Sequence, residues 1–128
     1  MSSLYIIIPA YNEAENIEKT ISDWYPVVES HNEEGNSRLV IINDGSKDNT
    51  YDLVCRLAKK HPLLVPLTKS NGGHGSTVLY GYRYAIQNHA DYIFQTDSDG
   101  QTSSGEFESF WEKRDLYDAV LGDRRERG

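Results

Sequence analysis

The stretch DYIFQTDSDGQ, residues 91–101, ends an apolar run at two aspartates, Asp97 and Asp99, with one residue between them. Side chains two residues apart in extended backbone leave on the same face of the chain. Two carboxylates held that close repel each other. A hard divalent cation removes the repulsion, because it accepts oxygen ligands from both groups. The spacing therefore predicts a site for Mg²⁺ or Mn²⁺ at Asp97 and Asp99.

Two other interpretations of this stretch compete with a metal site. Asp-Gly is a common turn-forming pair, so a simple turn stays open as an explanation of the aspartates. Read from Gln95, the stretch also approximates a calcium-binding EF-hand loop. That loop is excluded by its first residue being glutamine, by Thr102 where an apolar residue belongs, and by a lead-in typical of a strand.

A second stretch, NGGHGST at residues 71–77, places glycines at the start of an expected helix. Helix N-termini favour anions, so the stretch predicts contact with phosphate groups. It is not a Walker A loop, which needs a lysine, and Val78 stands where a dinucleotide fingerprint needs its third glycine. A flexible turn explains the glycines equally well, and a lone histidine such as His74 is more often a surface residue than a catalyst.

The elements that position these residues alternate between strand and helix. Pro66 predicts an edge position for the third strand. Every expected strand is a continuous apolar run, which indicates burial on both faces and hence a parallel sheet covered by helices. The fold class is therefore α/β, a doubly wound, mainly parallel sheet with helices on both faces. The expected strands are residues 4–8, 39–42, 63–67, 92–95 and 118–122.

The helices between these strands are expected from apolar residues at helical spacing. The first carries Ile17, Ile21, Trp24 and Val28, and Asp48 or Ser46 is expected to cap the second. The third is expected to bury Val78, Tyr82, Ala85 and Ile86. Asn12 and Glu15 approximate a capping box for the first helix, and Pro26 is expected to kink or end it.

In an open parallel sheet, ligands bind beyond the carboxyl ends of the strands. The polar clusters follow the ends of three expected strands, so we expect them along one rim of the sheet. Each cluster alone can be explained as a strand end or a helix cap, and their shared location is what favours a ligand site. The rim residues are Tyr11, Glu13, Asn43, Asp44, Asp97 and Asp99.

Composition narrows the function classes. The chain has 128 residues and a formal net charge of −7, which argues against a nucleic-acid partner because such binding requires basic side chains. Cys55 is the only cysteine, so no internal disulfide can form and a reducing compartment is expected. The N-terminal apolar run is too short to span a bilayer. These features predict a cytoplasmic protein that can still touch the cytoplasmic face of a membrane.

Five motifs in order resemble the N-terminal nucleotide-binding half of the family 2 glycosyltransferases, which have the GT-A fold. The branch that includes dolichyl-phosphate mannose synthase and polyprenyl-phosphate glycosyltransferases is the most similar. The resemblance covers nearly the whole chain. The motifs are IIIPAYNEAENI, VIINDGSKDNT, NGGHGS with Gly81, DYIFQTDSDGQ and DAVLGDRRER.

The resemblance implies a role for each motif. Pro9, Ala10, Tyr11 and Glu13 would line the nucleobase pocket, and Asp44 would hold the base or the ribose. The Gly72–Gly75 loop, with Gly73, His74 and Gly75, would close over the nucleotide. Asp97 would contact the nucleotide and, with Asp99, hold Mg²⁺ or Mn²⁺. Residues 124–127 match an arginine-containing stretch of relatives.

The resemblance also implies the reaction. The donor would be a UDP- or GDP-sugar, and a hexose would pass with inversion to a lipid phosphate or a saccharide. Residues 1–128 would form the nucleotide-sugar-binding domain, with the acceptor-binding half and the catalytic base expected beyond residue 128. Apolar surface near residues 118–122 would then be left for self-association.

Two other functions remain open. The missing base is compatible with a non-catalytic nucleotide-binding or assembly module. A sugar-nucleotide pyrophosphorylase shares the architecture but expects a glycine-rich, basic loop after the first strand, and PAYNEAEN is neither.

Overall fold

The computed structural model describes residues 3–97 and 104–112. Strands and helices alternate along this part of the chain, as predicted. The expected strand at 118–122, the self-association surface near it and the stretch at 124–127 lie outside the described residues. The elements are β1 (Leu4–Ala10), α1 (Ile17–Ser30), β2 (Arg38–Asp44), α2 (Thr50–Ala58), β3 (Leu64–Lys69), α3 (His74–Gln87), β4 (Tyr92–Gln95) and α4 (Ser104–Glu112).

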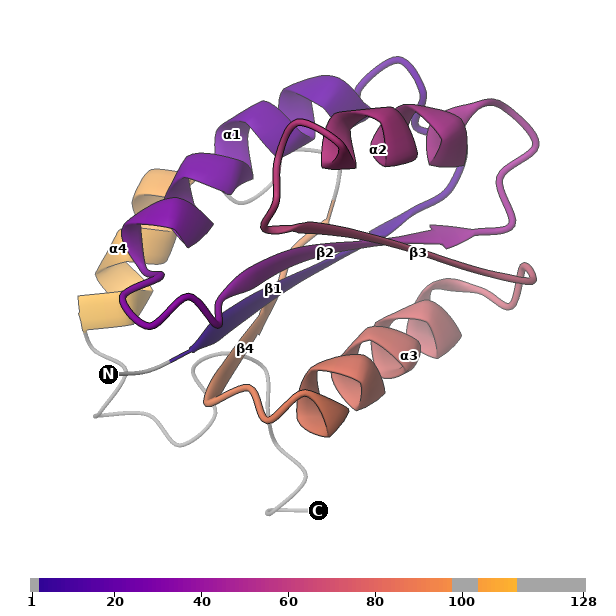
Figure 1. Cartoon of the computed structure of the whole chain (residues 1–128). Helices are drawn as coiled ribbons and strands as arrows, with labels where there is room; N and C mark the ends of the chain where they lie inside the picture. The colour runs from indigo at the N-terminus through magenta and orange to yellow at the C-terminus, as the bar shows by residue number, and fades with distance from the viewer. Residues whose placement is uncertain (1–2, 98–103, 113–128) are drawn as a thin grey trace.

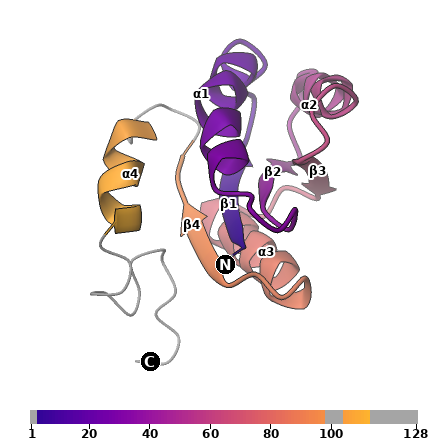
Figure 2. The same cartoon turned by 60° about the vertical axis from the view of Figure 1, so that its left-hand side comes forward.

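The four described strands form one parallel sheet in the order β3-β2-β1-β4. Helices α1, α2 and α4 lie on one face of the sheet and α3 lies on the other (Figures 1 and 2). The doubly wound parallel architecture predicted from the sequence is confirmed. Strand β3 lies at the edge, as Pro66 predicted, because proline cannot donate a hydrogen bond to a further strand.

The continuous apolar runs are explained by two separate cores. In β1, Leu4, Ile6 and Ile8 pack with residues of α1 in the larger core. The intervening Tyr5 and Ile7 pack on the other face in a core that includes Ala85 of α3. Since successive strand side chains point to opposite faces, both sets must be apolar when helices cover both sides.

Helix α3 approaches the sheet closely at Gly81. A Cβ atom there would lie 2.4 Å from Ile7 Cγ2 and 2.6 Å from Ile42 Cδ1. Only glycine fits without displacing those side chains. The close approach fixes α3 over β1 and β2, with its first turn at the carboxyl edge of the sheet (Figure 1).

Helix α4 is held on the α1 side of the sheet by aromatic packing. Phe107 is fully buried, and its ring centroid lies 4.9 Å from that of Phe94 and 6.0 Å from that of Trp24. His31, at the end of α1, pairs with Glu108 at 3.1 Å. These contacts anchor the chain immediately after residues 98–103.

The N-cap of α2 is Asn49, with no side-chain capping hydrogen bond, rather than the predicted Asp48 or Ser46.

Three further local predictions differ from the structure. Of the two predicted effects of Pro26, a kink or an end, the end is wrong: α1 continues to Ser30. Pro26 is exposed, so water can satisfy the carbonyl that loses its helical partner. Asn12 does not cap α1, because the N-cap of this helix is Asn16. Asn12 lies in a left-handed turn (φ 53°) that precedes the first helical residue, Ile17. Ile86 is 44% exposed rather than buried.

The exposure of Ile86 follows from the rotation of α3. The buried residues of this helix are Thr77, Gly81 and Ala85, which are spaced four apart and face the sheet. Ile86 is one residue further round the helix than Ala85, and its side chain therefore points away from the sheet.

Within the described residues, no helix has both the length and the apolar character required to cross a membrane.

Candidate functional site

One cavity of about 390 Å³ opens at the carboxyl edge of the sheet, which is a size that ligand pockets commonly have. Eight of the nine residues predicted to bind nucleotide line it. The ninth, Gly75, lies in the first turn of α3 and does not line it. The lining residues are Pro9, Ala10, Tyr11, Glu13, Asp44, Asn71, Gly73, His74, Thr77 and Asp97.

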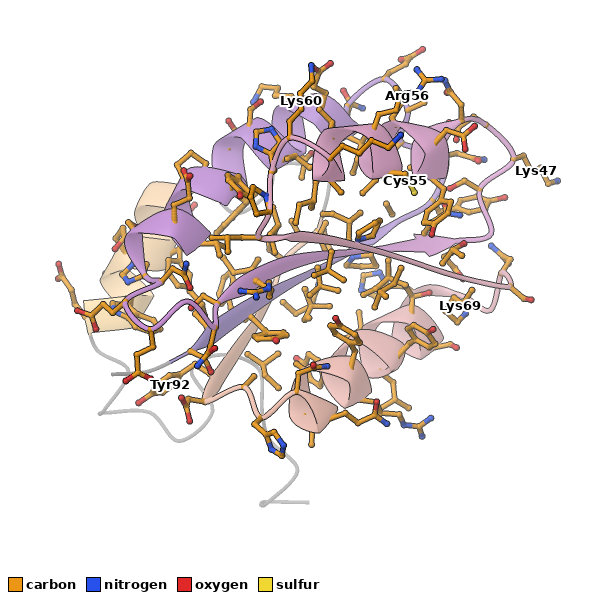
Figure 3. The ribbon with its side chains drawn as sticks, viewed as in Figure 1. Lys47, Cys55, Arg56, Lys60, Lys69 and Tyr92 are labelled. Atoms are coloured by element: carbon orange, nitrogen blue, oxygen red, sulfur yellow. The ribbon has the colours of Figure 1, made fainter. Side chains whose placement is uncertain are left out.

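Asp44 joins the end of β2 to the loop before α3. Its Oδ1 accepts hydrogen bonds from Gly72 N–H (2.9 Å) and from Lys69 Nζ (3.1 Å), and its Oδ2 accepts one from Gly73 N–H (3.1 Å). Asn71 Nδ2 donates to the Asp44 carbonyl oxygen at 2.9 Å. Lys69 lies at the end of β3, beside the start of α3 (Figure 3). Asp44 thereby holds the glycine loop in place.

The pKa of Asp44 reflects two opposing effects. Burial acts to raise the pKa of this carboxyl, which is 5% exposed. The hydrogen bonds from Gly72, Lys69 and Gly73 stabilise the charged form and outweigh burial, so the pKa lies below its ordinary value of 3.8. At neutral pH Asp44 is therefore a carboxylate on the cavity wall.

The N-terminus of α3 forms another side of the cavity. Gly73 precedes the helix with φ 96°, a conformation that strongly favours glycine. No side-chain hydrogen bond caps this end of the helix. Thr77 donates its N–H and its hydroxyl to the Gly73 carbonyl oxygen, at 3.1 and 2.8 Å. The free N–H groups of a helix start attract anions, which suits a phosphate-bearing ligand.

Asp97 brings a third carboxylate to the cavity, beside Glu13 and Asp44. Its Oδ1 accepts a hydrogen bond from Gln95 Nε2 at 2.9 Å and lies 3.7 Å from His74 Nε2. The side chain is 41% exposed, so this hard oxygen donor fits a Mg²⁺ or Mn²⁺ ligand shared with a phosphate.

The second predicted metal ligand, Asp99, lies outside the described residues. Residues 3–97 and 104–112 contain no group of three or more histidine, cysteine, aspartate or glutamate side chains placed to hold a metal.

Asn43 was predicted at the same rim but does not line the cavity. It is buried, its Nδ2 donates to Thr68 Oγ1 at 3.0 Å, and its Oδ1 accepts from Ser46 N–H at 3.3 Å. Asn43 therefore contributes to the packing between β2 and β3 rather than to the cavity wall.

Asn71 and Thr77 line the cavity, and Lys69 supports it, but sequence reasoning did not select them. The signal was available for two of them, since Asn71 directly precedes the glycines and Thr77 falls in the first turn of the helix that they open. Nothing in the local sequence paired Lys69 with Asp44, because that contact spans 25 positions of the chain.

The chain belongs to a glycosyltransferase family. Residues 5–128 match the family model described as glycosyl transferase family 2. This confirms the family predicted from the order of the motifs.

Curated relatives of this chain include enzymes named for lipid phosphates. A dolichyl-phosphate beta-glucosyltransferase of Trichomonas vaginalis is 34% identical over 111 residues, 84% of this chain and 32% of the relative. An undecaprenyl-phosphate mannosyltransferase of Micrococcus luteus is 27% identical over 123 residues, 95% of this chain and 48% of the relative. The matched part of the chain thus spans about a third of the first relative and about half of the second.

Solved structures support the GT-A fold. The structure of Staphylococcus aureus TarS residues 1–349 aligns with a TM-score of 0.66 at 17% identity, covering 89% of this chain and 32% of that one. A mannosyltransferase from Pyrobaculum calidifontis, solved with GDP-Man and Mn²⁺, aligns with a TM-score of 0.60 at 26% identity, covering 77% and 28%. The predicted GT-A architecture is confirmed.

Proposed function

We propose that this chain is the donor-binding part of a glycosyltransferase that uses a UDP- or GDP-sugar and transfers its hexose with inversion. The observation that carries the proposal is the convergence of eight predicted nucleotide-binding residues on one cavity, in a chain of glycosyl transferase family 2. The cavity also lies where open parallel sheets bind their ligands.

The walls of the cavity suit different parts of a nucleoside diphosphate. Tyr11, 43% exposed, offers a ring face to a base, and the Asp44 carboxylate can accept hydrogen bonds from a base or a ribose. The start of α3, with Gly73, His74 and Gly75, suits the diphosphate. Asp97 and Asp99 would hold the divalent cation.

Transfer of a hexose from such a donor leaves negative charge on the departing diphosphate. A divalent cation supplies charge neutralisation for that group as the bond breaks. The residues of this chain would orient the donor: Asp97, with Asp99, would hold the cation at the diphosphate end, and Tyr11 and Asp44 would hold the base or the ribose. The base that activates the acceptor is proposed to lie beyond residue 128.

The acceptor is proposed to be a polyprenyl phosphate. Support comes from the names of two relatives, which act on dolichyl phosphate and undecaprenyl phosphate. A lipid acceptor would bring the protein to the cytoplasmic face of a membrane.

Calorimetric titration tests donor binding. UDP-glucose and GDP-mannose are each added to the protein with Mn²⁺, and binding of at least one is expected. Asp97→Ala and Asp99→Ala should each weaken that binding, whereas Asp23→Ala, which removes an exposed carboxylate of α1, should not. Absence of binding, or indifference to both site variants, would contradict the proposal.

A transfer assay with the full-length protein separates the alternatives. Donor binding without transfer or donor hydrolysis would favour a non-catalytic module. Release of pyrophosphate from a nucleoside triphosphate and a sugar phosphate would favour a pyrophosphorylase.

A further inference from the structure

Three successive backbone N–H groups after β1 each donate to a side chain from residues 46–50. Asn12 N–H donates to Ser46 Oγ (2.8 Å), Glu13 N–H to Thr50 Oγ1 (2.9 Å), and Ala14 N–H to Asp48 Oδ2 (3.3 Å). In return, Lys47 N–H donates to Asn12 Oδ1 at 2.8 Å. We call these four hydrogen bonds the loop brace.

The loop brace begins where the sheet ends. The last register pair between β1 and β2 is Ala10 with Asn43. Beyond that pair the segments that follow β1 and β2 are no longer paired in the sheet. Hydrogen bonds to side chains connect these two segments instead. The wall that carries Tyr11 and Glu13 is therefore held by the loop brace rather than by the sheet.

Thr50 is the buried centre of the loop brace. It is 0% exposed, and its hydroxyl donates to Asp48 Oδ1 while its oxygen accepts from Glu13 N–H. Because the proton is directed at Asp48, a lone pair of Thr50 Oγ1 stays available to Glu13. Asp48 also accepts from Thr50 N–H at 3.0 Å, which fixes the start of α2 to the same point.

The loop brace controls where two cavity residues lie. Tyr11 and Glu13 both line the cavity and flank Asn12, whose left-handed backbone (φ 53°) turns the chain between them. Asparagine tolerates this conformation better than most residues. Glu13 in turn accepts the N–H groups of Asn16 and Ile17 at its carbonyl oxygen, so the wall continues directly into α1.

We propose that Thr50 is a positioning residue for nucleotide binding, acting through the loop brace on Tyr11 and Glu13 without touching the ligand. The inference rests on the proposed function, since it assumes that the cavity takes a nucleotide. A loop already held in its binding conformation spares the ligand the cost of ordering it. Loss of the loop brace should therefore weaken binding more than it disturbs the fold.

The test compares two substitutions at one position. Thr50→Val keeps the shape of the side chain and removes the hydroxyl, whereas Thr50→Ser keeps the hydroxyl. Calorimetry with UDP and GDP in the presence of Mn²⁺ should show about tenfold weaker binding for Thr50→Val, the equivalent of one buried hydrogen bond, and near-normal binding for Thr50→Ser. Ser46→Ala, a small change at a half-buried site, should also weaken binding.

Amide hydrogen exchange reports on the loop brace without any ligand. The Glu13 amide should exchange faster in Thr50→Val than in the unmodified protein, while the amides of β1 exchange at an unchanged rate. Ser30→Ala, which removes a hydroxyl at the far end of α1, serves as the control for both measurements.

The outcomes separate the two proposals. If the unmodified protein binds neither UDP nor GDP, the proposed function fails. If it binds one of them and both Thr50→Val and Ser46→Ala bind equally well despite faster exchange at residues 12–14, the loop brace is only structural and the inference is overturned.

Discussion

At the scale of single residues, the partners of a carboxylate decide what it can do. Asp44 is buried and accepts hydrogen bonds from two backbone N–H groups and an ammonium group. Asp97 is 41% exposed and has Gln95 as its hydrogen-bond donor. Asp44 therefore holds the glycine loop as part of the cavity wall, whereas the more exposed Asp97 is suited to exchanging its partner for a ligand.

The pKa of Asp44 leads to a prediction about acid stability. Because it lies below the ordinary value of 3.8, the carboxylate stabilises the fold at higher pH, and this contribution is lost as pH falls through the folded-state pKa. Asp44→Asn should cost about 2 kcal/mol at pH 7, because it removes the charge that accepts hydrogen bonds from Gly72, Gly73 and the half-buried Lys69 ammonium. Urea denaturation across pH should show this difference shrinking below about pH 4.

An exposed ion pair provides the matched control. Asp23 pairs with Lys19 at 2.9 Å on the surface of α1, with half of the Asp23 side chain exposed. Asp23→Asn should change the free energy of unfolding by less than about 1 kcal/mol. An equal loss in both variants would show that the hydrogen bonds of Asp44 do not stabilise the fold.

At the scale of elements, the position of α3 sets the shape of the cavity. This helix supplies His74 and Thr77 to the lining, and it reaches the sheet where Gly81 lets it lie against Ile7 and Ile42. Packing near the middle of the helix thus decides where its first turn lies.

Two glycines of α3 give opposite predictions. Gly81→Ala should destabilise the protein by about 1–3 kcal/mol, since its Cβ would lie 2.4 Å from Ile7 Cγ2 and would overpack the core. Gly75→Ala has no atom within 4 Å of the new Cβ and should be neutral or stabilise by up to about 1 kcal/mol through helix propensity. Urea denaturation measures both, and equal effects would refute the packing argument.

At the scale of the whole molecule, charge opposes an anionic ligand. The chain carries a formal net charge of −7, and Glu13, Asp44 and Asp97 line the cavity. The partial positive charge at the start of α3 offsets only part of this charge. We therefore expect a diphosphate to require a cation for binding, whereas a neutral nucleoside should not.

This contrast predicts which ligands depend on metal. Removing Mn²⁺ with a chelator should weaken binding of UDP or GDP by at least about tenfold, and it should leave binding of uridine or guanosine nearly unchanged. Calorimetry with and without chelator measures both. Diphosphate binding that survives metal removal would show that helix α3 and His74 suffice for the diphosphate.

The sequence by itself determined the parallel α/β architecture, the edge position of β3 and most of the cavity lining. The architecture rests on the continuous apolar runs, and the edge position rests on Pro66. Tyr11, Glu13, Asp44 and Asp97 follow from the rule that parallel sheets bind ligands at the carboxyl ends of their strands. The remaining predicted lining residues, Pro9, Ala10, Gly73 and His74, were implied by the resemblance to family 2 glycosyltransferases. Short segments of the sequence did not reveal three other features. These are the turn at Asn12, the continuation of α1 through Pro26 and the exposed position of Ile86.

Only the tertiary structure decided how the loops around the cavity are tied together. Asp44 reaches Gly72 across 28 positions of the chain, and Asn12 reaches Ser46 across 34. Such contacts depend on the geometry of the assembled sheet, because no local pattern says which of several polar residues will face one another. The sheet brings the loops to one edge, and hydrogen bonding of their backbone N–H groups then selects the partners.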